Sequence, residues 1–258
     1  NRLFYIQNLS QENYGNCDQL EFQMGNRCWG FVSEQSAVNK VILNDTCSNN
    51  IGNPSKHLGG SSFLTLDVDA NESKELLIGG NGFDNLLLLI NADETTDLTN
   101  STISSQDTTF PSNYGNTIPL KLDHFLAGYY LDINNDGVKD LISSTNALTI
   151  CSNSKNVWSY INSNASNNPD FNFSTNAFLQ EGMIEVGAGA SPAFVDYNAD
   201  GKLDLVVGNF GLFDRTVPDY HVASLWLYEN IGTLTHPAFQ LVDSNYANIP
   251  SLDLYATN

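Results

Sequence analysis

The sequence predicts an all-β fold of the β-propeller class, built from four-stranded blades that repeat every 64 to 65 residues. A nine-residue window rich in Asp and Asn begins at Asp67, at Asp132 and at Asp196, so its copies are 65 and 64 residues apart. A short apolar run follows each window, and an apolar run ending in Asn lies further downstream. A period of this length is typical of repeat architectures. The windows are called the first, second and third loops (residues 67–75, 132–140 and 196–204).

Each unit of the repeat predicts four short strands in a fixed order. One strand precedes the loop, a second follows it, as at 205–208, a third ends in Asn, and a fourth lies near 239–242. The third-strand runs occupy residues 4–8, 87–91, 158–162 and 226–230. Trp and Tyr recur at the same place in two of these runs, which favours a role in the core between blades over a carbohydrate platform.

The predicted organisation is one propeller segment. It comprises a partial blade with a Cys-containing insertion (1–61), three blades (62–124, 125–190 and 191–248) and a lead into a further blade (249–258). Residues 9–61 are expected to form the insertion and residues 92–118 a long surface loop, because they interrupt the repeat. Propellers contain about 4 to 8 blades, so we expect a segment of a larger ring, for example a seven-bladed one. A closed four-bladed ring is the alternative.

The charge balance restricts the partners of this chain. Ten basic residues stand against 29 acidic ones, giving a net charge of −19, which disfavours nucleic acid. No apolar run is long enough for a transmembrane segment. The richness in Asn, Ser and Thr suits a solvated extracellular surface. Since no signal peptide opens the sequence, any export signal is expected to be removed or to lie outside these residues.

The four cysteines indicate a disulfide rather than a zinc site, because they show no paired CxxC spacing. Three of them, Cys17, Cys28 and Cys47, fall in the insertion, where a covalent link would compensate for a thin core. We expect at least one bridge there, while the sequence leaves the connectivity, including that of Cys151, undetermined. Buried free thiols are the alternative.

The three loops have the composition of calcium sites. Calcium prefers about six to eight oxygen ligands in flexible geometry. Loop positions one, three, five and nine carry side-chain oxygen, and the carbonyl at position seven can add another. The predicted ligands of about three structural Ca²⁺ ions are Asp67, Asp69, Asn71, the Ser73 carbonyl and Glu75 in the first loop, Asp132, Asn134, Asp136, the Val138 carbonyl and Asp140 in the second, and Asp196, Asn198, Asp200, the Lys202 carbonyl and Asp204 in the third.

The sixth loop position should have a left-handed backbone that curls the loop around the ion. Gly137 and Gly201 adopt this conformation without strain, whereas Glu72 in the first loop would cost about 1 kcal/mol there. An EF-hand begins with the same pattern but needs a bidentate Glu at its twelfth position, where this chain has Ser143 or Val207. Solvated Asp/Asn turns without metal are the remaining alternative, and three copies in phase argue against it.

The loops and the strands after them resemble the FG-GAP/VCBS-repeat β-propellers. The resemblance is carried by residues 132–142 and 191–208, where a D-x-[DN]-x-[DN]-G-x-x-D loop is followed by an apolar strand. It implies that the ions stiffen blades rather than contact a ligand. Residues 227–232 and 237–241 are similar to the version found in large proteins of gliding and related bacteria, which implies export through type IX secretion.

We therefore expect a secreted or cell-surface binding or adhesion module, whose partner is a protein or a glycan. The resemblance adds components of type IX secretion at the outer membrane as partners. The alternative is a non-catalytic accessory propeller of an extracellular enzyme that acts on polysaccharide, and a structural spacer is a third possibility. No catalytic residue is proposed, since the four histidines lack zincin spacing and the residues around Ser191 lack the context of a nucleophile elbow.

Overall fold

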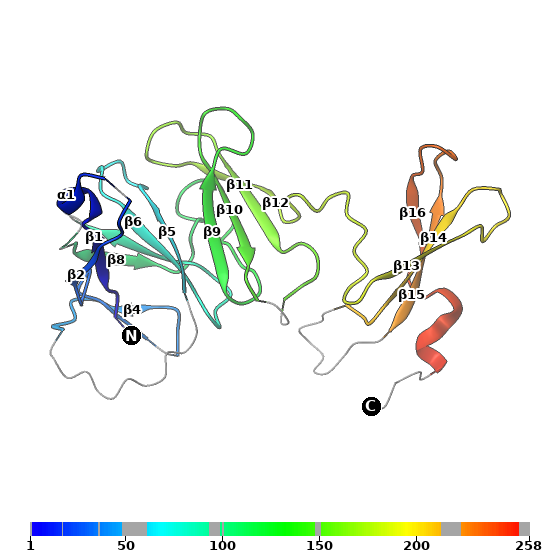
Figure 1. Ribbon diagram of the computed structural model, residues 1–258, viewed down its shortest axis with the longest axis horizontal. Helices are drawn as coiled ribbons and strands as arrows, with labels where there is room; N and C mark the ends of the chain where they lie inside the picture. The colour runs from blue at the N-terminus through cyan, green and yellow to red at the C-terminus, as the bar shows by residue number, and fades with distance from the viewer. Residues whose placement is uncertain are drawn as a thin grey trace. The chain divides into compact units, whose positions relative to one another are not determined.

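The computed structural model describes residues 2–16, 18–35, 37–47, 61–92, 99, 101–147, 151–212 and 223–252 (Figure 1). These residues form two compact units. The N-terminal unit comprises Asn1–Leu148 and Asn156–Phe178, and the C-terminal unit comprises Thr149–Lys155 and Leu179–Asn258. Strands dominate both units, which confirms the prediction of an all-β fold.

Three four-stranded antiparallel sheets carry the three loops, and in each sheet consecutive strands are neighbours. The first blade consists of β5 (Ser61–Leu66), β6 (Glu75–Gly80), β7 (Leu87–Asn91) and β8 (Ile103–Asp107); the second of β9 (Leu126–Leu131), β10 (Asp140–Thr145), β11 (Val157–Asn162) and β12 (Phe171–Thr175); the third of β13 (Ser191–Val195), β14 (Asp204–Asn209), β15 (Ser224–Asn230) and β16 (Phe239–Asp243). This meander is the blade of a β-propeller, so the predicted blade architecture is confirmed. The number of blades in the complete ring stays a prediction.

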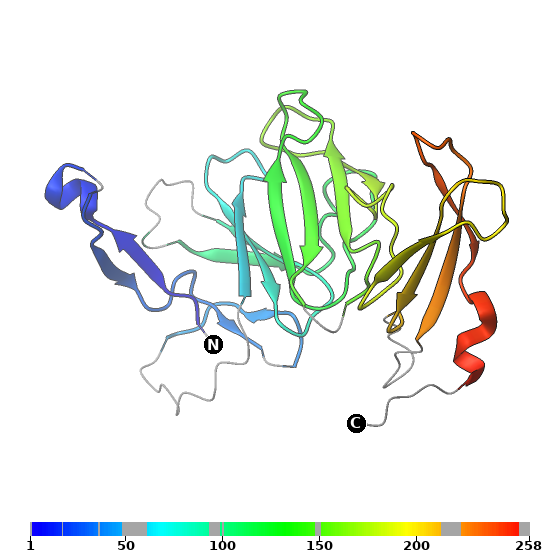
Figure 2. The same ribbon diagram turned by 45° about the vertical axis from the view of Figure 1, so that its right-hand side comes forward.

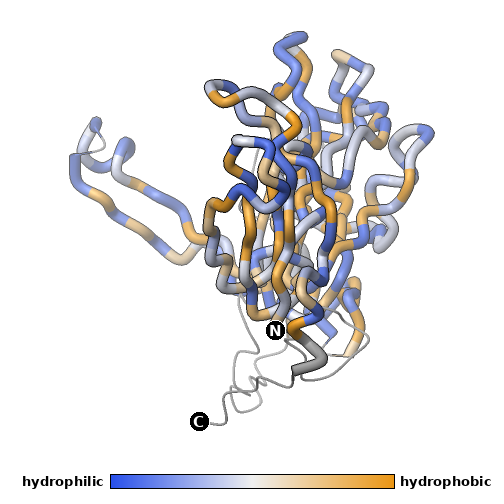
Figure 3. The backbone as a smooth tube through the Cα atoms, turned by 90° about the vertical axis from the view of Figure 1, so that its right-hand side faces the viewer, coloured by the Kyte–Doolittle hydropathy of each residue, from blue (hydrophilic) through white to orange (hydrophobic). Residues whose placement is uncertain are grey.

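The first blade is buried on both faces, which explains why its central strands are continuous apolar runs. Leu77 and Leu88 face a core shared with the second blade. Their chain neighbours, including Ile78 and Leu87, face a second core. Figure 3 shows the hydropathy of each residue along the backbone, with apolar stretches in orange between polar ones in blue.

Residues from the N-terminal segment complete this second core. Leu3, Val32 and Val41 are buried against the first blade. The same segment forms β1 (Tyr5–Asn8), α1 (Ser10–Tyr14), β2 (Phe22–Asn26), β3 (Ser33–Glu34) and β4 (Val41–Ile42), with β1 paired to β2 and β3 to β4. The β1–β2 hairpin extends away from the first blade (Figure 2). The predicted insertion is thus a covering layer of the first blade.

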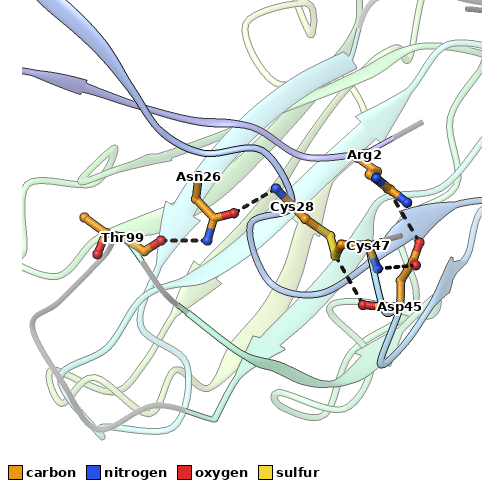
Figure 4. Close-up of a disulfide and its surroundings, with 6 residues drawn as sticks. All are labelled: Arg2, Asn26, Cys28, Asp45, Cys47 and Thr99. Carbon is orange, nitrogen blue, oxygen red and sulfur yellow. Dashed lines mark hydrogen bonds and ion pairs between the residues drawn. A yellow bond between two sulfur atoms is a disulfide. The ribbon is translucent and has the colours of Figure 1, made fainter. Parts of the chain in front are cut away.

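A disulfide between Cys28 and Cys47 fastens this layer (Figure 4). The two Cα atoms are 6.1 Å apart and 19 residues apart in sequence. Beside the bridge, Asp45 accepts a hydrogen bond from the Cys47 amide at 2.9 Å and forms an ion pair with Arg2 at 3.8 Å. The hydrogen bond from Cys47 is the largest of the effects that lower the pKa of Asp45. The expected bridge in the insertion is confirmed, while Cys17 lies outside the described residues.

The recurring aromatic residues of the third strands pack into hydrophobic clusters, and in the second blade this cluster is the predicted core between blades. Tyr160 is fully buried in the core between the first and second blades, and Trp158 packs against it. In the third blade, Tyr228 is buried with Val186 and Val207 while Trp226 packs on the same cluster. These rings therefore serve packing rather than an exposed carbohydrate platform.

Two predicted irregular segments contain strands. Strand β2 lies inside the predicted insertion 9–61 and pairs with β1 from Tyr5↔Asn26 to Asn8↔Phe22. Strand β8 lies inside residues 92–118, so the prediction of a continuous surface loop there is wrong. Its sequence hides it because only Ile103 is buried and the other four residues are Ser, Gln and Asp.

Helices are short in the described part of the chain. Helix α1 has five residues, and the 3₁₀-helix η2 (Tyr246–Leu252) packs beside β15 within the C-terminal unit. Residues 253–258 of the predicted lead into a further blade lie outside the described residues. Among the described helices, none has the length and apolarity to cross a membrane.

Gly79 of β6 marks a close approach between the first two blades. A Cβ atom there would overlap the carbonyl oxygen of Leu126, the first residue of β9. We expect Gly79→Ala to destabilise the protein by about 1–3 kcal/mol, because the backbone of the neighbouring blade must move. Urea denaturation followed by tryptophan fluorescence measures this change.

Gly208 provides the matched control, because it occupies the same place in the third blade. A Cβ atom at Gly208 would meet its nearest neighbour, a side-chain carbon of Leu225, at an ordinary 3.4 Å. Gly208→Ala should therefore change stability by less than about 1 kcal/mol. Equal losses for both variants would show that the close approach of the blades is not the cause.

Candidate metal centre

Each loop connects the first two strands of its blade. The first loop joins β5 to β6, the second joins β9 to β10, and the third joins β13 to β14 (Figure 1). The residue before each loop pairs with the ninth loop residue: Leu66 with Glu75, Leu131 with Asp140, and Val195 with Asp204. Since strands frame all three loops, the EF-hand alternative is excluded.

All three loops use a left-handed backbone at the same two positions. At the sixth position φ is +70° for Glu72, +86° for Gly137 and +83° for Gly201. The first loop therefore has the strained conformation expected for Glu72. The fourth position is also left-handed, with φ between 59° and 63° in the three loops, at Ala70, Asn135 and Ala199. Asn is common in this conformation, but the two alanines carry no sequence signal for it.

The first loop brings three carboxylates together. One oxygen each of Asp67, Asp69 and Glu75 lies within 4.8 Å of the others, and within the described part of the chain this is the only such group of three metal-binding side chains. Glu75 is fully buried and Asp67 is 4 % exposed. Like charges at this separation repel one another unless a proton or a cation neutralises them.

Glu75 has one oxygen that no protein group satisfies. Its Oε2 accepts a hydrogen bond from the Val68 amide at 2.8 Å. Its Oε1 is buried without a hydrogen-bond partner in the described part of the chain. Burial, together with the charges of Asp69 and Asp67, raises the pKa of Glu75 to about 7. An unsatisfied buried oxygen beside two carboxylates is the expected feature of a cation ligand, so the residues of this loop fit Ca²⁺.

In the second and third loops, the ninth carboxylate is satisfied on both oxygens. Asp140 accepts hydrogen bonds from the amides of Ile133 at 3.1 Å and Asn162 at 2.9 Å. Asp204 accepts the equivalent bonds from Tyr197 at 3.1 Å and Asn230 at 2.8 Å. Because Asn162 and Asn230 end the third strands, each of these carboxylates ties its loop to the middle of the blade.

The remaining carboxylates of these two loops bind backbone amides of their own loop. Asp132 accepts bonds from the amides of residues 135 to 137, and Asp196 from those of residues 200 and 201. Asp136 and Asp200 each accept one from the residue two positions on. The two loops do not bring three carboxylate oxygens within 4.8 Å of one another, in contrast to the first loop.

Two side chains account for part of this difference. The Lys202 ammonium lies 3.0 Å from Asp200 and donates to the Asn230 carbonyl at 2.6 Å. Hydrogen bonds from Lys202, first from its amide and then from its side chain, lower the pKa of Asp200. In the second loop, the side-chain amide of Asn134 donates to the Asp136 carboxylate at 2.8 Å. The sequence indicated oxygen ligands at these positions but not these internal bonds.

The predicted amide and carbonyl ligands lie within the same loops. Asn71, Asn134 and Asn198 each accept a hydrogen bond from the amide two positions on, at 2.9, 3.0 and 3.1 Å respectively. The residues proposed to offer carbonyls, Ser73, Val138 and Lys202, donate their amides to the fifth loop residue. The loops thus repeat one hydrogen-bond pattern.

The Asn that ends each third strand is a structural residue whose role the sequence did not reveal. Asn91, Asn162 and Asn230 are at most 3 % exposed. The Asn162 side chain donates to the Lys139 carbonyl at 3.1 Å and accepts from the amides of Asn164 and Asp170. Asn230 likewise accepts from the amides of Gly232 and Ala238. In the second and third blades this Asn therefore holds the turn between the third and fourth strands.

A polar hollow of about 320 Å³ lies beside the first loop, between the first and second blades. Its lining includes Asp67 and Lys74 of the first loop, Lys139 of the second loop and residues 164–167 of the turn between β11 and β12. Asn167 donates to Asp67 at 3.0 Å, and the Lys74 ammonium lies 3.9 Å from the same carboxylate. The hydrogen bond from Asn167 to Asp67 joins residues 100 positions apart in the sequence.

Residues 132–207 match the family model described as FG-GAP-like repeat. The match begins at Asp132, the first residue of the second loop, and ends at Val207 in β14, after the third loop. It supports the resemblance to FG-GAP repeats that these two loops carry in the sequence. A search of the curated proteins found no match.

The residues that could suggest catalysis are dispersed. Ser191 is the first residue of β13, at the entrance to the third blade. His124 is half-buried in the N-terminal unit, His236 is exposed in the C-terminal unit, and His57 and His221 lie outside the described residues.

The buried ninth carboxylate should stabilise the protein independently of metal. We expect Asp140→Ala to cost about 2–4 kcal/mol in calcium-free buffer, because two backbone amides lose their acceptor. The exposed Asp136, in the same loop, is the matched control, and Asp136→Ala should cost less than about 1 kcal/mol. Urea denaturation in excess chelator measures both. Equal losses would contradict the anchoring role of Asp140.

The raised pKa of Glu75 predicts a pH-dependent stability in calcium-free buffer. The folded protein holds this proton up to about pH 7, whereas the unfolded chain releases it near the ordinary value of 4.5. Between these pH values the folded state binds more protons, so stability falls as the pH rises from about 4.5 to 7. Glu75→Gln should remove this loss and stabilise the metal-free protein at pH 8 by on the order of 2 kcal/mol.

Glu72→Gln is the control, because Glu72 is exposed in the same loop. This variant should keep the pH dependence of the parent. Thermal unfolding from pH 4 to 8 in excess chelator provides the measurement. If Glu75→Gln leaves the pH profile unchanged, repulsion among the three carboxylates is not a source of instability.

Proposed function

We propose that this chain is a calcium-stabilised, non-catalytic β-propeller module of an exported protein, acting as a binding or adhesion surface. The observation that carries the calcium assignment is the buried Glu75 Oε1, which has no partner in the described structure and lies in the cluster with Asp67 and Asp69. A divalent cation supplies the missing partner and neutralises the cluster.

Calcium would act at the turn that starts each blade. In the first loop the proposed ligands are Asp67, Asp69, Asn71, the Ser73 carbonyl and Glu75, and the clustering of Asp67 and Asp69 with Glu75 supports this set. In the second and third loops, calcium would replace the internal bonds of Asn134 and Lys202 with bonds to the ion. We propose about three ions in all, of which the first-loop ion has the strongest support.

The disulfide supports an extracellular location. Disulfides form and persist in oxidising compartments, and the Cys28–Cys47 bridge fastens the layer that covers the first blade. Extracellular calcium is also abundant enough to occupy sites of moderate affinity. We propose that the protein is secreted or held at a bacterial cell surface. A role as cargo or component of type IX secretion is proposed from the sequence resemblance alone.

The binding role is proposed because the blades offer a rigid scaffold with a polar hollow beside the first loop. The same hollow favours the second candidate, an accessory propeller of an enzyme that acts on polysaccharide, because polar linings suit glycans. In both candidate functions these 258 residues are not catalytic. Turnover of a polysaccharide by residues 1–258 alone would contradict them.

Removal of calcium should lower the thermal stability of the protein. At a free calcium concentration a thousand times the dissociation constant, one site contributes about 4 kcal/mol, which corresponds to a rise in Tm of roughly 10 °C. Differential scanning calorimetry of the chain in calcium, in magnesium and in chelator measures the shift. Magnesium should give a smaller rise, because it demands stricter octahedral geometry.

Glu75→Gln should lose a large part of the calcium-induced rise in Tm, while Glu72→Gln should retain it. Relative to the parent protein at pH 8, Glu75→Gln should therefore lower the Tm in calcium and raise it in chelator. An identical Tm for the parent protein in calcium and in chelator, with metal removal verified by elemental analysis, would contradict the assignment.

A further inference from the structure

The polar hollow beside the first loop is lined by both blades of the N-terminal unit. The first blade contributes the end of β5 and the first loop, and the second blade contributes Tyr130, the second loop and residues 164–167. Its volume of about 320 Å³ falls within the range of about 300–1,000 Å³ that is usual for small-molecule sites. Most of these sites are lined by apolar side chains, whereas this lining is mostly polar, so its ligand should be polar.

The turn at 164–167 holds its polar groups in place. The Asn164 side chain donates to the Asn168 carbonyl at 2.8 Å and accepts from the amide and hydroxyl of Ser166 at 3.1 and 3.0 Å. Asn167 is fixed by its bond to Asp67. Amides and hydroxyls offer both donors and acceptors, as sugar hydroxyls do. A preorganised set of such groups reduces the entropy that a ligand must overcome.

The charge of the hollow favours an anionic group on the ligand. Two of the ten basic residues of this acidic chain, Lys74 and Lys139, line it. Lys74 is already paired with Asp67. The Lys139 ammonium lies 5.8 Å from the centre of the Tyr130 ring, and within the described residues it makes no ion pair. Lys139 is therefore the cation that can pair with a ligand carboxylate.

We propose that the polar hollow binds an acidic saccharide, that is, a sugar that carries a carboxylate. Lys139 pairs with the carboxylate, and Asn164, Ser166 and Asn167 bind the ring hydroxyls. The lining contains no arginine, the residue that most often recognises phosphate. This inference deepens the proposed binding function by naming its ligand, and it rests on that function.

The test uses the full 258-residue chain in calcium-containing buffer. The probes are trisaccharides of galacturonic, glucuronic, mannuronic and guluronic acid, the methyl ester of each, and tri-glutamate, with binding measured by calorimetry. At least one acid should bind, and its ester, which keeps the hydroxyls but loses the charge, should bind about ten-fold more weakly. Lys139→Gln should weaken the acid about ten-fold and leave the ester unchanged.

Two further variants locate the binding. Ala165→Trp should abolish binding by filling the hollow, with an unchanged Tm as evidence of folding. Lys121→Gln, an exposed lysine outside the lining, should bind like the parent.

The proposal is overturned if no acid binds, if the ester or tri-glutamate binds as well as the acid, or if Lys139→Gln has no effect. Saccharide binding that survives Ala165→Trp would overturn this site while leaving the proposed binding module intact.

Discussion

A buried carboxylate at the ninth position of each loop is the constraint on which the blades depend. Glu75, Asp140 and Asp204 are fully buried at the first residue of the second strand. Each accepts a hydrogen bond from the amide of the second loop residue and so closes the turn. A buried charge is costly unless donors surround it, and the loop conformation provides those donors. The acidic pattern in the sequence therefore fixes the geometry of the hairpin as well as its candidate ligands.

The ninth residue of the first loop, Glu75, has one more methylene group in its side chain than Asp140 and Asp204, the ninth residues of the other two loops. The shorter Asp140 and Asp204 have a second oxygen bonded to the amide that ends the third strand. The longer Glu75 lacks this bond, and its second oxygen is left beside Asp67 and Asp69. The loop with the weakest sequence pattern therefore has the geometry that most needs a cation. The other two loops satisfy more of their oxygens internally, with Lys202 supplying the positive charge in the third.

The sequence predicted the features that repeat and missed those that depend on tertiary contacts. The spacing of the loops located the first hairpin of each blade, and the runs ending in Asn located the third strand. Strand β8 was missed because four of its five residues are polar and only Ile103 is buried, so the sequence shows no alternation of apolar and polar residues there. Ala70 and Ala199 carry no sign that their backbone is left-handed. The bond from Asn167 to Asp67 depends on the packing of two blades, which no local pattern encodes.

We expect a cation to bridge the three carboxylates of the first loop. Anomalous diffraction from a crystal grown in calcium tests it most directly. We expect a peak within coordination distance of Asp67, Asp69 and Glu75, with Glu75 Oε1 among the ligands. A well-ordered loop with no anomalous peak, in which a water or a protein donor satisfies Glu75 Oε1, would contradict it.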